Sequence, residues 1–263
     1  MKNYKNIKFD TIDGVATITL NRPEAANGIN IPLAKDLLDA AIICEAWQEV
    51  RVVIITGEGK MFCGGGDINS FSEAGEHVSE MLTELTCLMH AAFCRLRHMR
   101  APVIVAVNGT AAGAGLSLAV LGDYVVASEK AKFTMAYTGI GLSPDGSSSH
   151  FLPRLIGLRK TQELMLTNRL LSAQEAADWG IINKVVAPDE VMPEALALAQ
   201  QLAKGPTNAY GAVKDLLNMT HLNGLEAQMD LETRYISKMG SSKDGKEGVA
   251  AFLEKRAPEF KGL

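Results

Sequence analysis

Cysteine is scarce in this chain of 263 residues, which contains only four. None of the four belongs to a Cys-x-x-Cys pair or has the spacing of a zinc site, and four are too few for a disulfide-rich secreted scaffold. The first residues are charged and are not followed by the apolar segment of a secretory signal. We therefore expect a reduced, cytoplasmic protein without a metal site.

An excess of positive charge is also missing, since 26 Lys and Arg are outweighed by 30 Asp and Glu. This balance argues against binding of nucleic acid through its phosphates. No segment reaches the roughly 18 consecutive apolar residues that a membrane-spanning helix requires. Hydrophobic residues nevertheless make up 47% of the chain, which excludes intrinsic disorder. We expect a folded core, with neither nucleic acid nor a membrane as partner.

Apolar patterns predict an α/β fold. Val15–Leu20 alternates apolar residues with threonine, as a half-buried strand does, whereas Val52–Thr56 and Val103–Val107 are continuous β-branched runs typical of buried parallel strands. Apolar residues at helical spacing predict helices over residues 33–47 and 77–99 between these strands. The alternation of strands and helices indicates a core with a partly parallel sheet.

The last part of the chain has a different pattern. After Pro153 nearly all of it is predicted to be helical, with a capping box at Ser172 and Glu175. No linker or low-complexity segment interrupts it. We therefore expect an α/β core over residues 1–200 and a helical C-terminal region over residues 201–263.

Two glycine-rich segments follow the predicted buried strands. Met61–Asp67 contains three consecutive glycines, which allow the backbone to bend closely around an anion. Asn108–Leu118 leaves the second strand and enters a helix, whose first N–H groups lack partners and can hold an oxyanion. Neither matches a Walker A loop or the Rossmann spacing, and each is also compatible with a purely structural turn.

A third segment combines proline with an acidic residue. Asp145 lies between Pro144 and Gly146, in a turn that leads into a predicted helix. Taken alone, it fits a helix cap or turn residue as well as a catalytic carboxylate.

Taken in order, these segments closely resemble the crotonase (enoyl-CoA hydratase/isomerase) superfamily. The resemblance covers nearly the whole chain, from Leu20–Pro23 to Phe252–Arg256, and includes the segment Leu171–Val186. It implies a spiral of β-β-α units, a helical C-terminal region that forms a homotrimer or a dimer of trimers, and an acyl-CoA thioester ligand. Coenzyme A would enter as part of the substrate, with no separate cofactor.

The resemblance also implies functions for particular residues. The two backbone N–H groups of the family's oxyanion hole would come from Gly66 and Ala114. Further contacts to the acyl-CoA would come from Ala25, Ala26, Cys63, Gly64, Asp67, Ile68, His90, Gly113, Tyr137 and Lys255. Lys255 or Arg256 would reach the phosphates of a neighbouring subunit's ligand. We expect the acyl group to lie against apolar residues of the long helix: Met81, Leu82, Leu85, Met89 and Phe93.

Differences from the family's hydratases at two positions indicate which reaction to expect. Hydratases of the family carry two catalytic Glu, and this chain has Ser117 and Tyr137 at the matching positions. Water addition normally uses such a pair. Asp145 matches the single catalytic acid of the family's enoyl-CoA isomerases, where one carboxylate moves a proton from C2 to C4. We therefore expect an isomerase with Asp145 as the catalytic carboxylate.

Other reactions remain open. Aryl-CoA dehalogenases of the family have a nucleophilic Asp at the position of Asp145, together with a His at that of His90 and a Trp at that of Tyr137. A thioester hydrolase, a hydratase or a non-catalytic acyl-CoA binder would also be compatible with the motifs.

Overall fold

A six-stranded sheet forms the centre of the computed structural model, which describes residues 2–263. Strands β1 and β2 are antiparallel, and the others run parallel to their neighbours. In spatial order they are β1 (Ile7–Ile12), β2 (Val15–Leu20), β3 (Val52–Gly57), β5 (Val103–Val107), β7 (Tyr124–Ser128) and β10 (Lys184–Val186). The predicted strands at β2, β3 and β5 are therefore confirmed.

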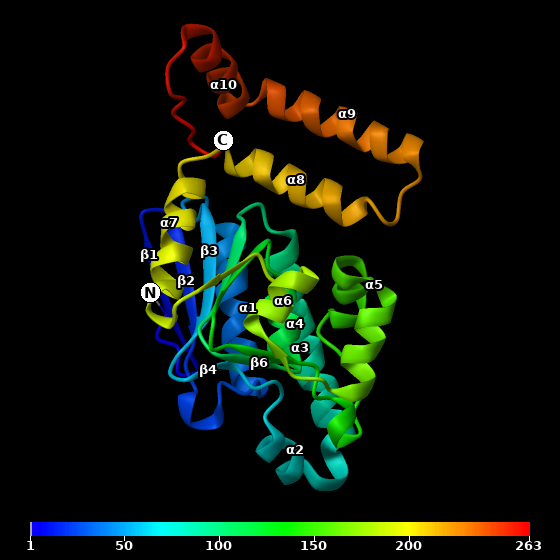
Figure 1. The fold of residues 1–263 in the computed structure, drawn as a ribbon. Helices are drawn as coiled ribbons and strands as arrows, with labels where there is room; N and C mark the ends of the chain where they lie inside the picture. The colour runs from blue at the N-terminus through cyan, green and yellow to red at the C-terminus, as the bar shows by residue number, and fades with distance from the viewer. Residues whose placement is uncertain (1) are drawn as a thin grey trace.

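A second, smaller sheet repeats the order of the first. Its strands are β4 (Met61–Cys63), β6 (Thr110–Ala112), β8 (Lys132–Thr134) and β9 (Leu171–Ser172). Each of β3, β5 and β7 in the large sheet is followed by a strand of the small sheet and then by a helix. This repetition is the predicted spiral of β-β-α units, and it brings the chain segments after β4, β6 and β8 to one end of the molecule (Figure 1).

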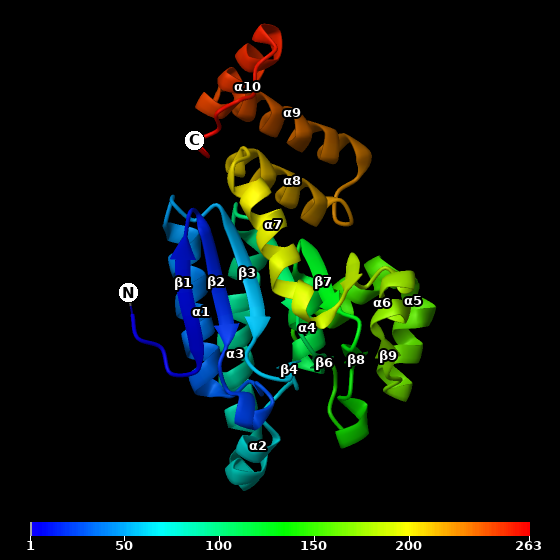
Figure 2. The same cartoon turned by 60° about the vertical axis from the view of Figure 1, so that its left-hand side comes forward.

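Helices cover both faces of the large sheet, which explains why β3 and β5 are apolar throughout. Val53 and Ile55 face the cluster beneath α1 (Ile31–Ala46) and α3 (Val78–His98). Val52 and Ile54 face α7 (Val191–Ala203) on the opposite side. Figure 2 shows α7 crossing one face while α1 and α3 lie behind the other. Burial on both faces removes the alternation that a half-exposed strand would show.

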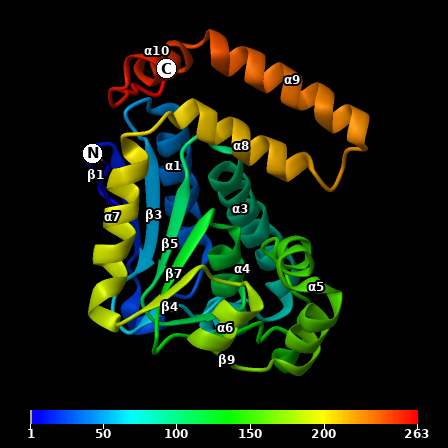
Figure 3. The same cartoon turned by 45° about the horizontal axis from the view of Figure 1, so that its top comes forward.

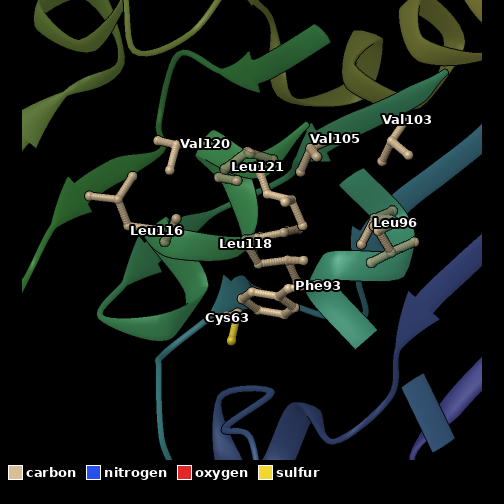
Figure 4. Packing of buried hydrophobic residues seen from close by; sticks show 14 of the residues in the cluster. Cys63, Phe93, Leu96, Val103, Val105, Leu116, Leu118, Val120 and Leu121 are labelled. Atoms are coloured by element: carbon tan, nitrogen blue, oxygen red, sulfur yellow. The ribbon is translucent and has the colours of Figure 1, made fainter. Parts of the chain in front are cut away.

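Helix α4 (Ala114–Leu121) is buried along its whole length. Gly115 permits this, because a Cβ there would lie 2.2 Å from the carbonyl oxygen of Cys63. Figure 4 shows Leu118 and Leu121 of α4 packed with Phe93 of α3. The N-terminus of α4 is therefore held against β4 by close packing.

The remaining helices are α2 (Ile68–Ala74), α5 (Ser148–Thr167), α6 (Ala173–Trp179), α8 (Thr207–Met219), α9 (Leu225–Ser241) and α10 (Lys243–Glu254). The last three stand at the end of the molecule opposite α2 (Figures 1 and 2), and Figure 3 shows the molecule with that end turned forward. Lys214 anchors α8, because its ammonium lies 2.8 Å from Asp123 and donates to two backbone carbonyls of the core. Burial lowers the pKa of Lys214, and the carboxylate of Asp123 opposes that change.

One expectation about the elements needs correction. The chain after Pro153 is not helical almost throughout, because β9 and β10 lie within it and complete the two sheets. The capping box at Ser172 and Glu175 is confirmed, and it starts α6. Among residues 2–263, no helix combines the length and the apolar character needed to cross a membrane.

Candidate active site

A cavity of about 470 Å³ opens where the three predicted segments meet. Its walls come from the turn after β4, the N-terminus of α4, one side of α3 and the segment that precedes α5. The lining residues that argue for a function are Gly64, Gly66, Ile68, Gly113, Ala114, Tyr137 and Asp145. Seven of the residues assigned from the sequence are thus brought together around one space.

The backbone N–H of Gly66 points away from the neighbouring segment of the same chain, which contains Ile29. Gly66 pairs with Ile29 in a parallel bridge, in which Ile29 donates to the carbonyl of Gly65 (2.7 Å) and accepts from Asp67 (3.0 Å). In such a bridge the flanking residues make both hydrogen bonds, so the N–H of the central residue points to the other side. That side is the cavity, which Gly66 lines.

The N–H of Ala114 is free for a different reason. Ala114 is the first residue of α4, and the first N–H groups of a helix have no acceptor within it. Gly113 makes the sharp entry into the helix with φ +52°, a value that favours glycine. A Cβ on Gly65 would lie 3.5 Å from the Ala114 nitrogen, so the two turns are in contact. Gly66 and Ala114 thus line the same cavity, where the family resemblance places the two donors of an oxyanion hole.

Asp145 reaches the same cavity from the opposite wall. Its Oδ1 accepts a hydrogen bond from the Tyr137 hydroxyl, and its side chain is 25% exposed. Its backbone carbonyl accepts from the hydroxyls of Ser117 and Ser148, each at 2.9 Å. The carboxylate is therefore attached to a turn that is fixed from two helices, α4 and α5.

His90 touches the same turn but does not line this cavity. Its Nε2 accepts the backbone N–H of Gly146 at 3.2 Å and lies 3.7 Å from Oδ2 of Asp145. A nitrogen that accepts an N–H carries a lone pair, so this hydrogen bond directs the lone pair of Nε2 toward Gly146. His90 faces an adjoining cavity of about 330 Å³, together with Phe93 and Gly146.

Tyr137 remains a hydrogen-bond donor over a wide pH range. Burial and the negative charge of Asp145 raise the pKa of Tyr137 well above its ordinary value. Its hydroxyl is also 3.5 Å from the Ser117 hydroxyl, which is completely buried. The two positions at which hydratases carry Glu thus hold neutral hydroxyl groups around Asp145.

Asp67 and Cys63 lie beside the first turn but do not line the cavity. Asp67 caps α2 and pairs with Arg22 at 2.8 Å. Burial alone would raise the pKa of Asp67, but the hydrogen bonds from Arg22 and Ser70 outweigh it and lower the value. Cys63 is buried in the core, and burial raises its pKa to about 12. Neither side chain therefore reaches the cavity, which is lined by the glycines of this turn.

Three further residues assigned to ligand binding lie outside the cavity. Ala26 accepts the N–H of Gly64 at 2.8 Å, so residues 25 and 26 lie directly beside the first turn. Lys255 is exposed at the C-terminal cap of α10, near the end of the molecule opposite α2 (Figure 1). It does not contact the cavity of its own chain.

The structure adds residues that the sequence analysis did not assign. Ser148 fixes the Asp145 carbonyl, and its place three residues later at a helix start is a signal that could have been used. Phe71 lies over Gly66, where a Cβ would come within 2.4 Å of the ring, and no sequence pattern indicates this contact. Of the predicted acyl-pocket residues, Leu82, Leu85 and Met89 line the cavity, whereas Met81 and Phe93 do not.

Comparison with known proteins agrees with this geometry. Residues 10–263 match the family model described as enoyl-CoA hydratase/isomerase. The chain is 39% identical over 250 residues to 1,2-epoxyphenylacetyl-CoA isomerase of Escherichia coli K12, covering 95% of each protein. It is 33% identical over 261 residues to trans-2-decenoyl-[acyl-carrier-protein] isomerase of Streptococcus mutans, covering 99% of each.

A solved structure gives the same result at the level of the fold. The crystal structure of an enoyl-CoA hydratase from Polaromonas sp. JS666 superposes with a TM-score of 0.92 and 35% identity, covering 97% of this chain and 99% of that one. The chain belongs to the enoyl-CoA hydratase/isomerase family of the crotonase superfamily.

Proposed function

We propose that the protein is an enoyl-CoA isomerase that moves a double bond from C3–C4 to C2–C3, or performs a related isomerisation of a cyclic acyl-CoA. Asp145 takes a proton from C2, and the negative charge spreads from the resulting dienolate onto the thioester oxygen. The N–H groups of Gly66 and Ala114 stabilise that oxygen. Asp145 then returns the proton at C4, so that the enzyme is unchanged after one turnover.

The observation that carries this proposal is the single carboxylate of the cavity. Among the described residues that line it, Asp145 is the only Asp or Glu. Ser117 and Tyr137 supply hydroxyl groups instead of the two carboxylates that water addition uses, and a 1,3-proton shift needs only one base. The names of two relatives, both isomerases, support the same assignment.

The substrate class follows from the rest of the lining. Ile68, Phe71, Leu82, Leu85 and Met89 make the cavity predominantly apolar, as a hydrocarbon acyl group requires. We assign the coenzyme A part to the mouth near Ala25 and Ala26. Coenzyme A is released with the product as part of the thioester, so no separate cofactor takes part.

One observation favours a second function. His90 lies 3.7 Å from Asp145, which is the arrangement expected if Asp145 were a nucleophile and His90 activated water in an aryl-CoA dehalogenase or thioester hydrolase. However, Nε2 already accepts the N–H of Gly146, so the nitrogen nearest to Asp145 is not free to take a proton from water. Release of halide from a haloaryl-CoA would nevertheless establish this function instead.

The variant Asp145→Asn tests the isomerase directly. We expect turnover of a 3-enoyl-CoA, followed by the ultraviolet absorbance of the conjugated product, to fall by about 10²–10⁴-fold or more, because the general base is lost. Affinity for a saturated acyl-CoA, measured by calorimetry, should stay within about threefold, because the apolar walls and both backbone donors are retained.

Asp178→Asn is the matched control, since Asp178 is an exposed carboxylate on α6 that does not line the cavity. It should leave both quantities unchanged. An Asp145→Asn variant with normal turnover would refute the assignment. Formation of 3-hydroxyacyl-CoA from a 2-enoyl-CoA by the wild-type protein would show that a hydratase operates without a second carboxylate.

A further inference from the structure

The two oxygens of the Asp145 carboxylate have different surroundings. Oδ1 accepts a hydrogen bond from the Tyr137 hydroxyl. Among the described residues, no side chain or backbone group donates to Oδ2, and its neighbour at 3.7 Å, Nε2 of His90, is itself an acceptor. One oxygen therefore has a fixed donor, and the other has none among the described residues.

Tyr137 is well placed to maintain this difference between the two carboxylate oxygens of Asp145. Its ring lies against the second glycine turn, 3.8 Å from the position of a Cβ on Gly113, and its hydroxyl also approaches Ser117. A phenol with a raised pKa keeps its proton, and a hydrogen bond to an ionised carboxylate is among the stronger ones in proteins.

We infer that Tyr137 is a positioning residue that holds Oδ1 of Asp145 and so reserves Oδ2 for both proton transfers. This inference rests on the proposed isomerase function. The C2–H bond breaks as the Oδ2–H bond forms, and the same O–H bond then breaks as the C4–H bond forms. Tyr137 donates to Oδ1 throughout, so that its own O–H bond stays intact and the carboxyl group does not rotate.

Use of the same oxygen, Oδ2, for both proton transfers has a geometric benefit. C2 and C4 of a dienolate lie in the plane of the thioester, and a single oxygen on one face of that plane reaches both with a small shift. Proton transfer depends steeply on such placement, because misplacement by about 1 Å can cost about 10²-fold in rate. A carboxylate held only through its own backbone would have a free torsion at its end.

Tyr137→Phe is the decisive variant, because it removes the hydroxyl and keeps the ring. We expect kcat to fall by about 10- to 100-fold, since a hydrogen bond to a charged group is lost, while KM changes by no more than about twofold. The split between the two constants is the informative readout, because a loss of packing in the cavity wall would raise KM as well.

His90 also lies against Asp145, so its contribution must be separated from that of Tyr137. In a His90→Gln background, where the amide oxygen can still accept from Gly146, the fall in kcat caused by Tyr137→Phe should persist. Tyr4→Phe is the matched control: the Tyr4 hydroxyl donates to Asp39 of α1, on a different part of the molecule, and its loss should leave kcat and KM unchanged.

A second measurement uses the wild-type protein and does not depend on the variant folding. With 3-enoyl-CoA carrying two deuterium atoms at C2, we expect most of the transferred deuterium at C4 of the product, detected by mass spectrometry and NMR. Complete loss of that deuterium to solvent would overturn the inference. So would an unchanged kcat in Tyr137→Phe while Asp145→Asn is inactive, whereas an active Asp145→Asn would overturn the isomerase itself.

Discussion

Ala114 offers a way to remove one backbone donor without deleting a side chain. It is the first residue of α4, a position where proline is well tolerated because its missing N–H would have no helical partner. In Ala114→Pro the ring carbon would replace the N–H that points into the cavity. We expect kcat to fall by about 10²–10³-fold, the usual cost of one oxyanion donor, with the melting temperature within a few degrees of wild type.

Lys243→Pro is the control, since Lys243 is the exposed first residue of α10. It should retain full activity in the same assay. Normal turnover by Ala114→Pro would show that the N–H of Ala114 does not hold the thioester oxygen.

At the scale of single residues, the sequence predicts which residues meet at the site better than it predicts where their side chains point. Gly66, Ala114 and Asp145 were predicted to share a site, and they line one cavity, because each motif sets the local backbone. Cys63 and Asp67 stand in the same glycine motif, yet their side chains point into the core and toward Arg22. Which way a side chain turns depends on residues far along the chain, and a motif does not contain that information.

At the scale of single elements, the long buried strands were predictable and the short ones were not. β3 and β5 have continuous β-branched sequences, whereas β4, β6 and β8 have three residues each, too few to show a period. The short strands matter for function, because they direct the first two glycine turns toward the cavity. Their pairing comes from contacts between successive β-β-α units.

The helices α8–α10 have an apolar surface that predicts assembly of several chains. They expose large apolar side chains, including Ile236 (73% exposed) and Phe252 (83%), more than a free surface normally leaves in water. We propose that these helices form the homotrimer that the family resemblance implies. Light scattering should then give three times the chain mass of 28.2 kDa, or six times for a dimer of trimers.

Ile236→Glu should lower that mass, because a charge would be buried without a partner. Asp230→Lys, at an exposed position of the same helix, is the control and should not change it. A wild-type mass of one chain at micromolar concentration would contradict the proposal, and it would also remove the basis for assigning Lys255 to a neighbour's coenzyme A.

For the molecule as a whole, the fold explains why three distant segments make one site. The strands of the two sheets run in the same spatial order, so the chain returns to the same end after each β-β-α unit. Two of these returns provide the glycine turns, and the third provides the segment that contains Tyr137 and Asp145. The order of the motifs predicted this arrangement, while the hydrogen bonds of Ser117, Ser148 and His90 to the Asp145 turn became visible only in three dimensions.

The measurement that tests the central claim most directly is a crystal structure of Asp145→Asn with bound 3-enoyl-CoA. We predict that the thioester oxygen lies about 2.7–3.1 Å from both the Gly66 and the Ala114 nitrogens. C2 and C4 should each lie about 3–3.5 Å from the side-chain atom that replaces Oδ2. A thioester oxygen bound elsewhere, or an acyl chain with both carbons beyond reach of residue 145, would contradict the account.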